Sequence, residues 1–240
     1  MSRIQIVSSL RSSDDLFFTV TFSSGEKLNF TAEEAFEYGL YLEGEFIENF
    51  ENVCTVVLAK RMMAFAASYV LFSMKSISQV KTKLEEYCKK AELEDDWLQF
   101  SESAVEEALR RLRESEYIND ETYSRRYTNT TLKSKPVSKA ALLNELVYKK
   151  GIDKDLAHSK PVDDAAEEKT VEEIYANDHN ISDGENAYRL LKKKTGGNIP
   201  YGDDSVAKKE LAKLYRFAGA KGFSYRDIEE ALSRIREENN

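Results

Sequence analysis

The first fifty residues of the chain alternate apolar and polar positions with the period of β-strands. Ile4 and Ile6 alternate with polar neighbours, and residues 16–22 form an aromatic and β-branched run. A Ser-Ser-Gly-Glu turn follows, after which Leu28 and Phe30 alternate again. This pattern predicts three strands near the amino terminus.

A short helix is expected directly after these strands. Thr31 and Glu34 have the spacing of a capping box, in which each side chain satisfies a backbone N–H of the other residue. Gly39 can end the helix in a left-handed conformation. Residues 1–50 therefore read as a small strand-rich head. It is too small to be stable alone, so we expect it to dock on the segment that follows.

From about Asn52 the apolar period becomes helical, and a long apolar helix is expected to reach Phe72. The stretch 53–74 is the strongest candidate for a membrane span. Lys60 and Arg61 divide it, however, and the apolar part that remains is too short to cross about 30 Å of hydrocarbon. The pattern favours a buried core helix. A second helix is expected over 76–88, and Trp97 is expected to pack the acidic connector after it onto the bundle.

The segment from Ser101 to Tyr127 predicts a helix, a tight corner and a second helix. Ser103 and Glu106 have capping-box spacing. One helix face then carries the apolar residues Val105, Ala108, Leu109 and Leu112. Asn119 and Asp120 can begin the second helix, which carries Tyr123 and Tyr127 on one side.

The same kind of corner occurs twice more. A helix with the apolar positions Ala140, Leu143, Leu146 and Val147 ends in Lys149-Lys150-Gly151-Ile152. Near the carboxyl terminus a helix over 208–220 ends in Lys221-Gly222-Phe223. There Ser224 and Asp227 can cap a last helix. Lysine complements the negative end of a helix dipole, and glycine accepts the left-handed conformation that ends the helix. The recurrence predicts an internal helical repeat.

The expected fold is mainly α: three tandem three-helix modules in an elongated array, preceded by the small strand-rich head. The expected boundaries are 1–50 for the head, 51–120 for the first module, 121–195 for the second, and 196–240 for the third. The second module contains an acidic insertion after Lys160, within which a helix around residues 171–175 is conceivable from the pattern alone.

Composition limits the classes of protein to consider. The 240 residues carry a formal net charge of −8, which argues against a general nucleic-acid coat protein. Cys54 and Cys88 lie in helical patterns without CxxC spacing, so we expect a buried thiol at each and no disulfide framework. The amino terminus lacks the basic and apolar regions of a secretory signal, and we expect a cytoplasmic protein.

The sequence lacks the common catalytic motifs. It contains no glycine-rich phosphate loop, no HExxH and no GxSxG. His158 and His179 lie in polar connectors without ligand-spaced partners and are expected to be solvated. We therefore expect neither an enzyme nor a resident cofactor or metal.

Two basic clusters stand out against the acidic average. Between residues 125 and 150 seven basic residues accompany only Glu145, and between 205 and 226 six accompany only Glu210. A single cluster would be read as an ordinary solvated helix face. Recurrence at equivalent places in two modules favours a basic stripe that faces an anionic partner. Together with two earlier arginines and two tyrosines, the candidate partner-binding residues are Arg110, Arg111, Tyr123, Arg125, Arg126, Tyr127, Lys133, Lys135, Lys139, Lys149, Lys150, Lys208, Lys209, Lys213, Arg216, Lys221 and Arg226.

The two tyrosines have two readings. Tyr123 and Tyr127 lie beside Arg125 and Arg126 and could stack on nucleic-acid bases. Their spacing of four residues equally fits the core stripe of the helix.

The run AVEEALRRLRESEYINDETYSRRY resembles the junction of the first and second modules in the RecX family of RecA regulators. The runs KKGIDKDLA and YRFAGAKGFSYRDIEEAL follow in the order that the family has, so the resemblance extends from about Asn52 to the end. It implies three tandem three-helix modules in an elongated, curved body. It also implies a regulator that lies in the groove of the RecA filament on DNA and inhibits ATP turnover and strand exchange, and so acts in recombination, repair and the SOS response. The expected partners are the RecA filament and single- or double-stranded DNA, with no membrane, and the chain is expected to be a monomer.

The chain departs from the family pattern in three respects. The first module carries Lys89-Lys90-Ala91 and an acidic insertion in place of the Lys-Gly corner, and the second contains the acidic segment after Lys160. The chain is also more acidic than strongly basic members. These departures put DNA binding by the isolated chain in question more than recombinase binding.

A second hypothesis belongs to a different class. A helix, a glycine corner and a second helix also describe a helix-turn-helix, so the chain could be a DNA-binding protein that acts without a recombinase. That hypothesis predicts tight, strongly salt-dependent binding to bare duplex DNA.

Overall fold

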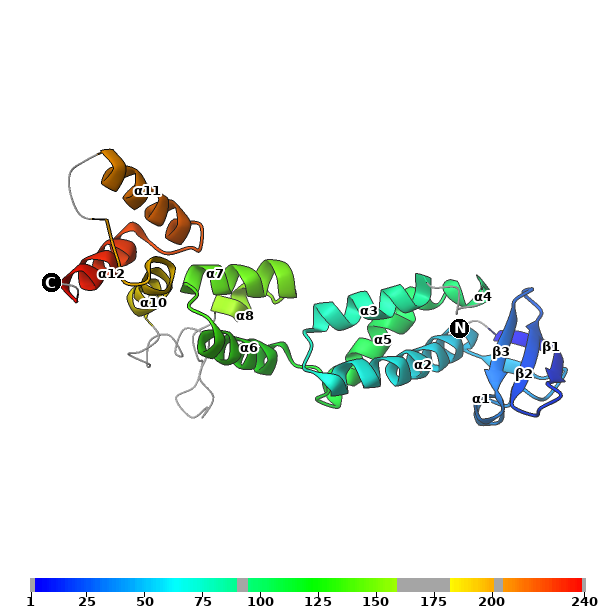
Figure 1. The fold of residues 1–240 in the computed structure, drawn as a ribbon. Helices are drawn as coiled ribbons and strands as arrows, with labels where there is room; N and C mark the ends of the chain where they lie inside the picture. The colour runs from blue at the N-terminus through cyan, green and yellow to red at the C-terminus, as the bar shows by residue number, and fades with distance from the viewer. Residues whose placement is uncertain (1–2, 90–94, 159–181, 201–204, 239–240) are drawn as a thin grey trace. The chain divides into compact units, whose positions relative to one another are not determined.

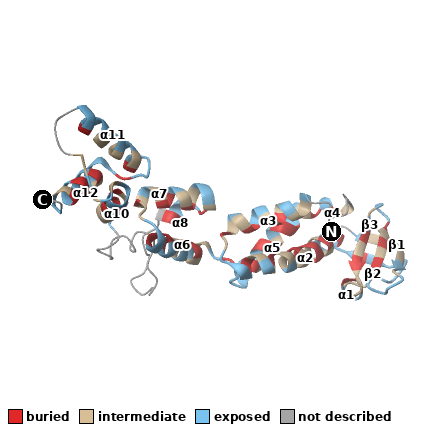
Figure 2. Ribbon diagram, viewed as in Figure 1, coloured by how far each residue is buried: buried red, intermediate tan, exposed pale blue. Residues whose placement is uncertain are grey.

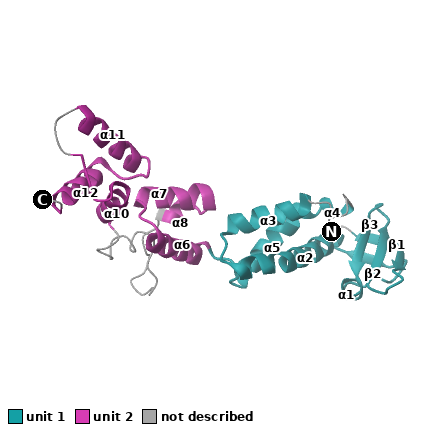
Figure 3. Cartoon of the chain, viewed as in Figure 1, with its two compact units in different colours: residues 1–119 teal, residues 120–240 magenta. Residues whose placement is uncertain are grey.

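The computed structural model describes residues 3–89, 95–158, 182–200 and 205–238 (Figure 1). The acidic segment after Lys160, the helix considered at 171–175 and His179 lie outside these residues. The chain divides into two compact units, residues 1–119 and 120–240, shown in separate colours in Figure 3. The fold is mainly helical with a small sheet at the amino terminus, as predicted. The division into three modules stays a prediction.

The head contains a four-stranded antiparallel sheet with the order β3-β2-β1-β4. Three of its strands are those that the alternation predicts, and the three-residue β4 is additional. A β-bulge between Ile6 and Ser8 interrupts the pairing of β1 with β2. The elements of the head are β1 (Arg3–Arg11), β2 (Phe17–Phe22), β3 (Lys27–Thr31), α1 (Ala32–Glu37) and β4 (Phe46–Glu48).

The predicted capping box at the start of α1 is present. The Thr31 hydroxyl accepts from the Glu34 N–H, and the Glu34 carboxylate accepts from the Thr31 N–H at 2.8 Å. The helix ends at Glu37 with Tyr38 as its C-cap, and Gly39 follows with φ +67°. Local sequence therefore sets both ends of this helix.

The helices of the first unit pack on the sheet around one shared core. Figure 2 shows buried residues along α2 and α5 and on the sheet. The predicted stripe of α5, from Val105 to Leu112, is buried. Trp97 is buried against Phe30 of β3, with ring centroids 5.2 Å apart, so it joins the connector to the sheet as well as to the helices. These helices are α2 (Phe50–Phe72), α3 (Ile77–Lys89), α4 (Asp95–Leu98) and α5 (Ser101–Glu114).

The predicted capping box of Ser103 and Glu106 is wrong. Helix α5 begins two residues earlier, at Ser101, so Ser103 already lies inside its first turn. The Ser101 hydroxyl donates to the Leu98 carbonyl at 2.7 Å, which ties α5 to the short helix before it. Burial of Phe100 and Trp97 fixes this start more strongly than the serine spacing does.

Among the described residues, α2 is the one helix long and apolar enough to cross a membrane. A core helix passes the same test, and the packing of α2 is that of a core helix. Cys54 and Met62 are fully buried in the shared core, whereas Lys60 and Arg61 bond to carboxylates of α1. Cys88 is half-buried in α3, and both thiols are free.

Arg61 links three parts of the first unit. Its guanidinium donates to both carboxylate oxygens of Glu34, to the Asn29 carbonyl of β3 at 2.8 Å, and lies 4.7 Å from the centre of the Trp97 ring. The Glu34 side chain is only 12% exposed and the Arg61 side chain 27%. One side chain thus joins the long helix, the sheet and the connector.

The second unit contains two core clusters. One contains side chains of α6, α7, η1 and α8, and the other contains side chains of α10, α11 and α12. Its elements are α6 (Asp120–Ser134), α7 (Lys139–Asn144), the π-helical turn η1 (Glu145–Lys149), α8 (Lys154–His158), α10 (Asp183–Thr195), α11 (Ser205–Gly219) and α12 (Tyr225–Glu237). Helix α10 precedes the expected boundary at residue 195, yet Ala187 and Leu191 share a core with α12.

The apolar stripe predicted for α7 differs in one position. Leu142 is fully buried with Leu143 and Leu146, whereas Ala140 is exposed. Burial of leucine removes more apolar area from water than burial of alanine, so the helix turns its leucines inward.

Three corners of the chain share two features. Glu116, Gly151 and Gly222 have positive φ angles of 58°, 67° and 84°. After each corner a buried apolar residue donates its N–H back to the preceding helix: Ile118 to Leu112, Ile152 to Leu146 and Phe223 to Ala218. The last corner leads into α12, whose predicted capping box of Ser224 and Asp227 is present.

Replacement of Arg61 by alanine should destabilise the first unit by roughly 3 kcal/mol, because Glu34 would remain buried without its partner. Urea unfolding followed by the fluorescence of Trp97, the single tryptophan, measures this directly. Lys60→Ala is the matched control. Its partner Glu37 is 44% exposed, so the loss should stay below about 1 kcal/mol. Equal midpoints for the two variants would show that Arg61 does not have the linking role.

Candidate functional site

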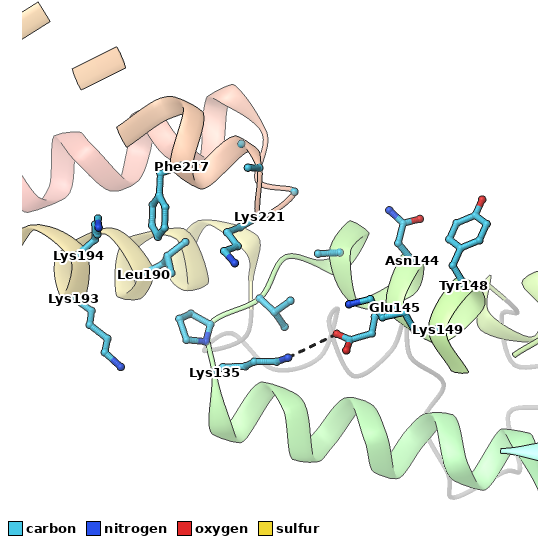
Figure 4. A pocket seen from close by; sticks show the side chains of 16 residues that line it. Lys135, Asn144, Glu145, Tyr148, Lys149, Leu190, Lys193, Lys194, Phe217 and Lys221 are labelled. Carbon is cyan, nitrogen blue, oxygen red and sulfur yellow. Dashed lines mark ion pairs between the residues drawn. The ribbon is translucent and has the colours of Figure 1, made fainter. Parts of the chain in front are cut away.

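A groove of about 980 Å³ lies in the second unit, between the α7 region on one side and α10 with the corner after α11 on the other (Figure 4). Its floor is apolar and includes Val137, Leu190 and Phe217. Its walls carry the five lysines Lys135, Lys149, Lys193, Lys194 and Lys221.

Hydrogen bonds at the start of α7 join the two sides of this groove. The Ser138 hydroxyl accepts from the Ala141 N–H at 3.1 Å, as a helix cap, and donates to the Lys221 carbonyl at 2.9 Å. The Asp183 carboxylate of α10 accepts from the Lys139 N–H at 2.8 Å. Two N–H groups in the first turn of α7, which have no partner within the helix, therefore bond to side chains. One acceptor, Ser138, is local, and the other, Asp183, is distant in the sequence.

The ionised form of Asp183 is disfavoured by burial at this position. Burial raises the pKa of Asp183 and the nearby Asp227 charge acts in the same direction, while the hydrogen bond from the Lys139 backbone partly opposes them. Asp183 also lies at the positive end of the α7 dipole, which favours its ionised form.

Gly222 permits the close approach at this junction. A Cβ atom at this position would lie 2.5 Å from the Ser138 hydroxyl oxygen and 3.3 Å from the Cβ of Ala141. Its φ of +84° is also a conformation that other residues rarely adopt. Both the backbone angle and the contact require glycine.

The charges on the groove are unbalanced. Among the described residues that line it, Glu145 is the one carboxylate, and it lies 3.7 Å from the Lys135 ammonium, the ion pair drawn in Figure 4. Within the described part of the chain, Lys149, Lys193 and Lys221 have no carboxylate at ion-pair distance. Lys194 lies over the Phe217 ring, 5.2 Å from its centre. The groove can therefore accept further negative charge.

Glu145 stays ionised in this setting. Its partial burial acts to raise its pKa, but a hydrogen bond from Tyr127 and the charges of Lys135, Lys149 and Lys150 together lower the pKa of Glu145 below its usual value. The same carboxylate, with burial, raises the pKa of Tyr127.

Three of the sequence-predicted residues line the groove: Lys135, Lys149 and Lys221. The sequence analysis missed Lys193 and Lys194, which belong to a lysine run that precedes Gly196 at the end of α10. That run is the same signal as the two lysine-glycine corners, so it could have been found. Among the described residues, no group of three or more His, Cys, Asp or Glu side chains is placed to hold a metal.

The other predicted basic residues of the second unit do not line the groove. Several have partners nearby: Arg125 pairs with Glu121, Lys213 with Glu210 and Arg226 with Glu230. Lys150 lies 5.1 Å from the centre of the Tyr127 ring. The other members of this set that lie away from the groove are Arg126, Lys133, Lys139, Lys208, Lys209 and Arg216.

Arg110 and Arg111 lie in the first unit and are bound to acidic residues of their own helix. Both donate to Glu107, at 2.7 and 2.6 Å, and Arg110 also pairs with Glu114. These hydrogen bonds lower the pKa of Glu107 to about 2. Their predicted part in partner binding stays a prediction.

Tyr123 is a core residue of the second unit. Its ring is 6% exposed and stacks on Tyr127 with ring centroids 5.8 Å apart. The burial of this ring fits the core alternative, and a partner contact by either tyrosine stays a prediction. The aromatic side chain exposed on the groove is Tyr148, which is 81% exposed.

Comparison with known proteins confirms the resemblance that the sequence predicts. The chain is 27% identical over 134 residues to the regulatory protein RecX of Caldanaerobacter subterraneus subsp. tengcongensis. The matched region covers 56% of this chain and about half, 55%, of that relative. No model of a known protein family matches the chain.

Two solved structures have a similar fold. A crystal structure of regulatory protein RecX matches with a TM-score of 0.56 and 15% identity, over 94% of this chain and 97% of the other. RecX from Lactobacillus salivarius matches with a TM-score of 0.51 and 18% identity, over 74% of this chain and 96% of the other. At these identities the structural likeness concerns the fold alone.

Replacement of Gly222 by alanine should destabilise the second unit by about 2 to 4 kcal/mol, because it combines backbone strain with loss of the Ser138 cap. Gly196→Ala is the matched control: its φ is +63°, but nothing lies within 4 Å of an added Cβ, so only strain of about 1 kcal/mol is expected. Urea unfolding followed by far-ultraviolet circular dichroism compares the two variants. Trp97 lies in the first unit, and its fluorescence transition should not move. Equal destabilisation by both alanines would contradict the close-contact explanation.

Proposed function

We propose that this chain is a RecX-type regulator that binds the RecA filament and inhibits its ATPase and strand-exchange activities. It would thereby act in recombination, DNA repair and the SOS response, as a cytoplasmic monomer without catalytic activity. The observation that carries the proposal is the sequence match to a regulatory protein RecX, supported by the shared fold. That relative is described as a regulatory protein, so RecA as the partner of this chain is part of the proposal.

We further propose that the lysine-lined groove is the contact surface for the filament. A nucleoprotein filament displays phosphates and acidic side chains, and a groove with five lysines and one carboxylate complements such a surface. The ammonium groups are compact charges on flexible stems, so they can adjust to a surface whose anions are not fixed in one pattern. The apolar floor can bury side chains of the protein component.

The proposal extends to the organisation of the helical part as tandem three-helix modules. The three corners at Glu116, Gly151 and Gly222 support it, because each combines a left-handed residue with a buried apolar residue. Such corners would arise if one helical unit had been duplicated.

Charge distribution favours a nucleoprotein partner over bare DNA. The first fifty residues contain nine acidic and three basic residues, a net charge of −6 out of the total of −8. Long-range repulsion between this head and a polyanion weakens binding to free DNA. Contacts to the protein component of a filament would offset the repulsion. The helix-turn-helix alternative has the three corners in its favour but lacks a strongly basic chain.

Reversal of three groove lysines, Lys149→Glu, Lys193→Glu and Lys221→Glu, should weaken inhibition of strand exchange by at least about tenfold, which corresponds to 1.4 kcal/mol of lost filament binding. The control reverses three exposed lysines outside the groove, Lys27, Lys89 and Lys154. Each triple variant lowers the net charge by six, from −8 to −14, so the control reports the general effect of charge. Its inhibition should stay within about twofold of wild type in moderate salt.

Two results separate the parts of this proposal. If the groove variant inhibits at wild-type concentrations, the groove is not the contact surface. If the wild-type chain fails to co-sediment with RecA, nucleotide and single-stranded DNA, the regulator role itself is wrong. Tight binding to bare duplex, with affinity that falls steeply as salt rises, would favour the DNA-binding alternative.

A further inference from the structure

The head sheet has one open edge. Strand β4 pairs with β1 only from Arg3 to Gln5, after which Ile6 exchanges backbone hydrogen bonds with Gly44 and Glu45. The β-bulge between Ile6 and Ser8 comes next and marks the end of this pairing. From there to Arg11, β1 has a neighbouring strand on one side only, namely β2.

The backbone groups on this open edge can be assigned from the ladder. The Ser9 N–H donates to the Glu43 carboxylate at 2.9 Å, so it faces away from β2. The N–H and C=O groups of successive residues in a strand point to alternate sides. Those of Arg11, two residues after Ser9, therefore also point away from β2. Within the described residues no hydrogen bond to the Arg11 N–H occurs, and Leu10 is 63% exposed. On this edge the Arg11 N–H is therefore unpaired, whereas the Ser9 N–H already has the Glu43 carboxylate as its acceptor.

The opposite edge of the sheet is closed. The Asp96 carboxylate accepts from the Lys27 N–H of β3 at 2.8 Å, and Arg61 donates to the Asn29 carbonyl. Side chains of the helical part thus occupy the outer backbone groups of β3. On β1, among the described residues, the exposed Glu43 side chain has a comparable position on the Ser9 N–H, so a bound strand would have to displace it.

Exposed apolar side chains gather on the same head. Of the sixteen large apolar side chains that the described residues expose, eight lie within residues 1–46. Phe36 and Tyr41 form an aromatic pair with ring centroids 5.0 Å apart. Phe36 also contacts Phe18, which pairs with Arg11 in the register of β1 and β2. The aromatic pair therefore packs on β2, the strand next to β1, and exposed apolar surface near a sheet edge is typical of a peptide-binding site.

From these features we infer that the β1 edge binds an extended segment of a partner protein that alternates apolar and basic residues. Added as a strand, the segment would bond to the outward N–H and C=O of Arg11 and, after displacing the Glu43 carboxylate, to the Ser9 N–H. Its apolar residues would meet Phe36 and Tyr41, and its basic residues would pair with Glu43 and the other acids of a head with net charge −6. This inference does not rest on the proposed regulator role.

The test uses the full chain and three synthetic decapeptides with blocked ends. The first alternates valine and lysine, the second alternates valine and glutamate, and the third is the first with two central valines replaced by proline. Isothermal titration should give saturable binding of the Val-Lys peptide in the micromolar range. The proline-containing peptide should bind at least about tenfold more weakly, because it cannot complete a strand. The Val-Glu peptide, which the groove lysines attract, should leave exchange of the Arg11 N–H unchanged, because it has the wrong charge for the head.

Two variants at one position link the binding to the edge. Ser9→Pro removes the outward N–H, and proline is tolerated at an edge position of this kind. Ser9→Ala keeps the N–H and removes only the hydroxyl. We expect a tenfold or greater loss of Val-Lys binding for Ser9→Pro and none for Ser9→Ala, with the Trp97 unfolding transition unchanged in both. If Ser9→Pro does not fold, amide exchange in the wild-type chain decides, since bound peptide should slow exchange of the Arg11 N–H.

Several results would overturn the inference. Equal binding of the proline-containing peptide would show that charge alone attracts these peptides. Undiminished binding by folded Ser9→Pro, unchanged exchange at Arg11, or no saturable binding would exclude the edge. A concentration-dependent dimer that Ser9→Pro abolishes would assign the edge to a second copy of the chain.

Discussion

The arrangement of the second unit depends on one shared hydroxyl group. The Ser138 side chain caps α7 and also donates to the carbonyl of Lys221, a residue 83 positions later in the chain. This is possible only because Gly222 has no side chain to occupy the same space. The contact fixes the corner after α11 against the start of α7, and with it the distance between the two walls of the groove. Lys221 stands on one wall and Lys149 on the other, so the charge density of the groove follows from a hydrogen bond between neutral groups.

The first unit is joined in a comparable way, but by a charge. Arg61 interrupts an otherwise apolar helix, and its burial would be unfavourable if Glu34, the Asn29 carbonyl and the Trp97 ring did not surround it. The small sheet could not bury enough apolar area by itself. It gains stability from the shared core with α2 and α5, and Arg61 selects one orientation for that packing. Arg61, which argued against a membrane span in the sequence, is therefore also the residue that joins the head to α2.

Local signals made much of this fold predictable. The boxes at Thr31 and Ser224 and the buried face of α5 all follow from residues within one or two helical turns of each other. The failures have a different cause. Ser103 had the right spacing for a cap, but burial of Trp97 and Phe100 determines where α5 begins. Strand β4 is only three residues long and exists because β1 is beside it. The lysines of the groove could be predicted, because lysine runs are visible in the sequence. The contact between Ser138 and Lys221, which forms the groove, could not.

Charge is distributed along the chain so that its two candidate surfaces select different partners. The head holds −6 of the net charge of −8, whereas the groove in the second unit carries five lysines and one carboxylate. A polyanion attracts the groove and repels the head however the two units are oriented, since both effects depend only on the sign of the local charge. A basic segment is attracted to the head and repelled by the groove. If both proposals hold, the two surfaces would therefore take up partners of opposite charge. Salt would weaken both interactions, but the apolar floor of the groove and the backbone groups of the β1 edge do not depend on ionic strength, so each surface would retain part of its affinity where simple charge attraction is screened.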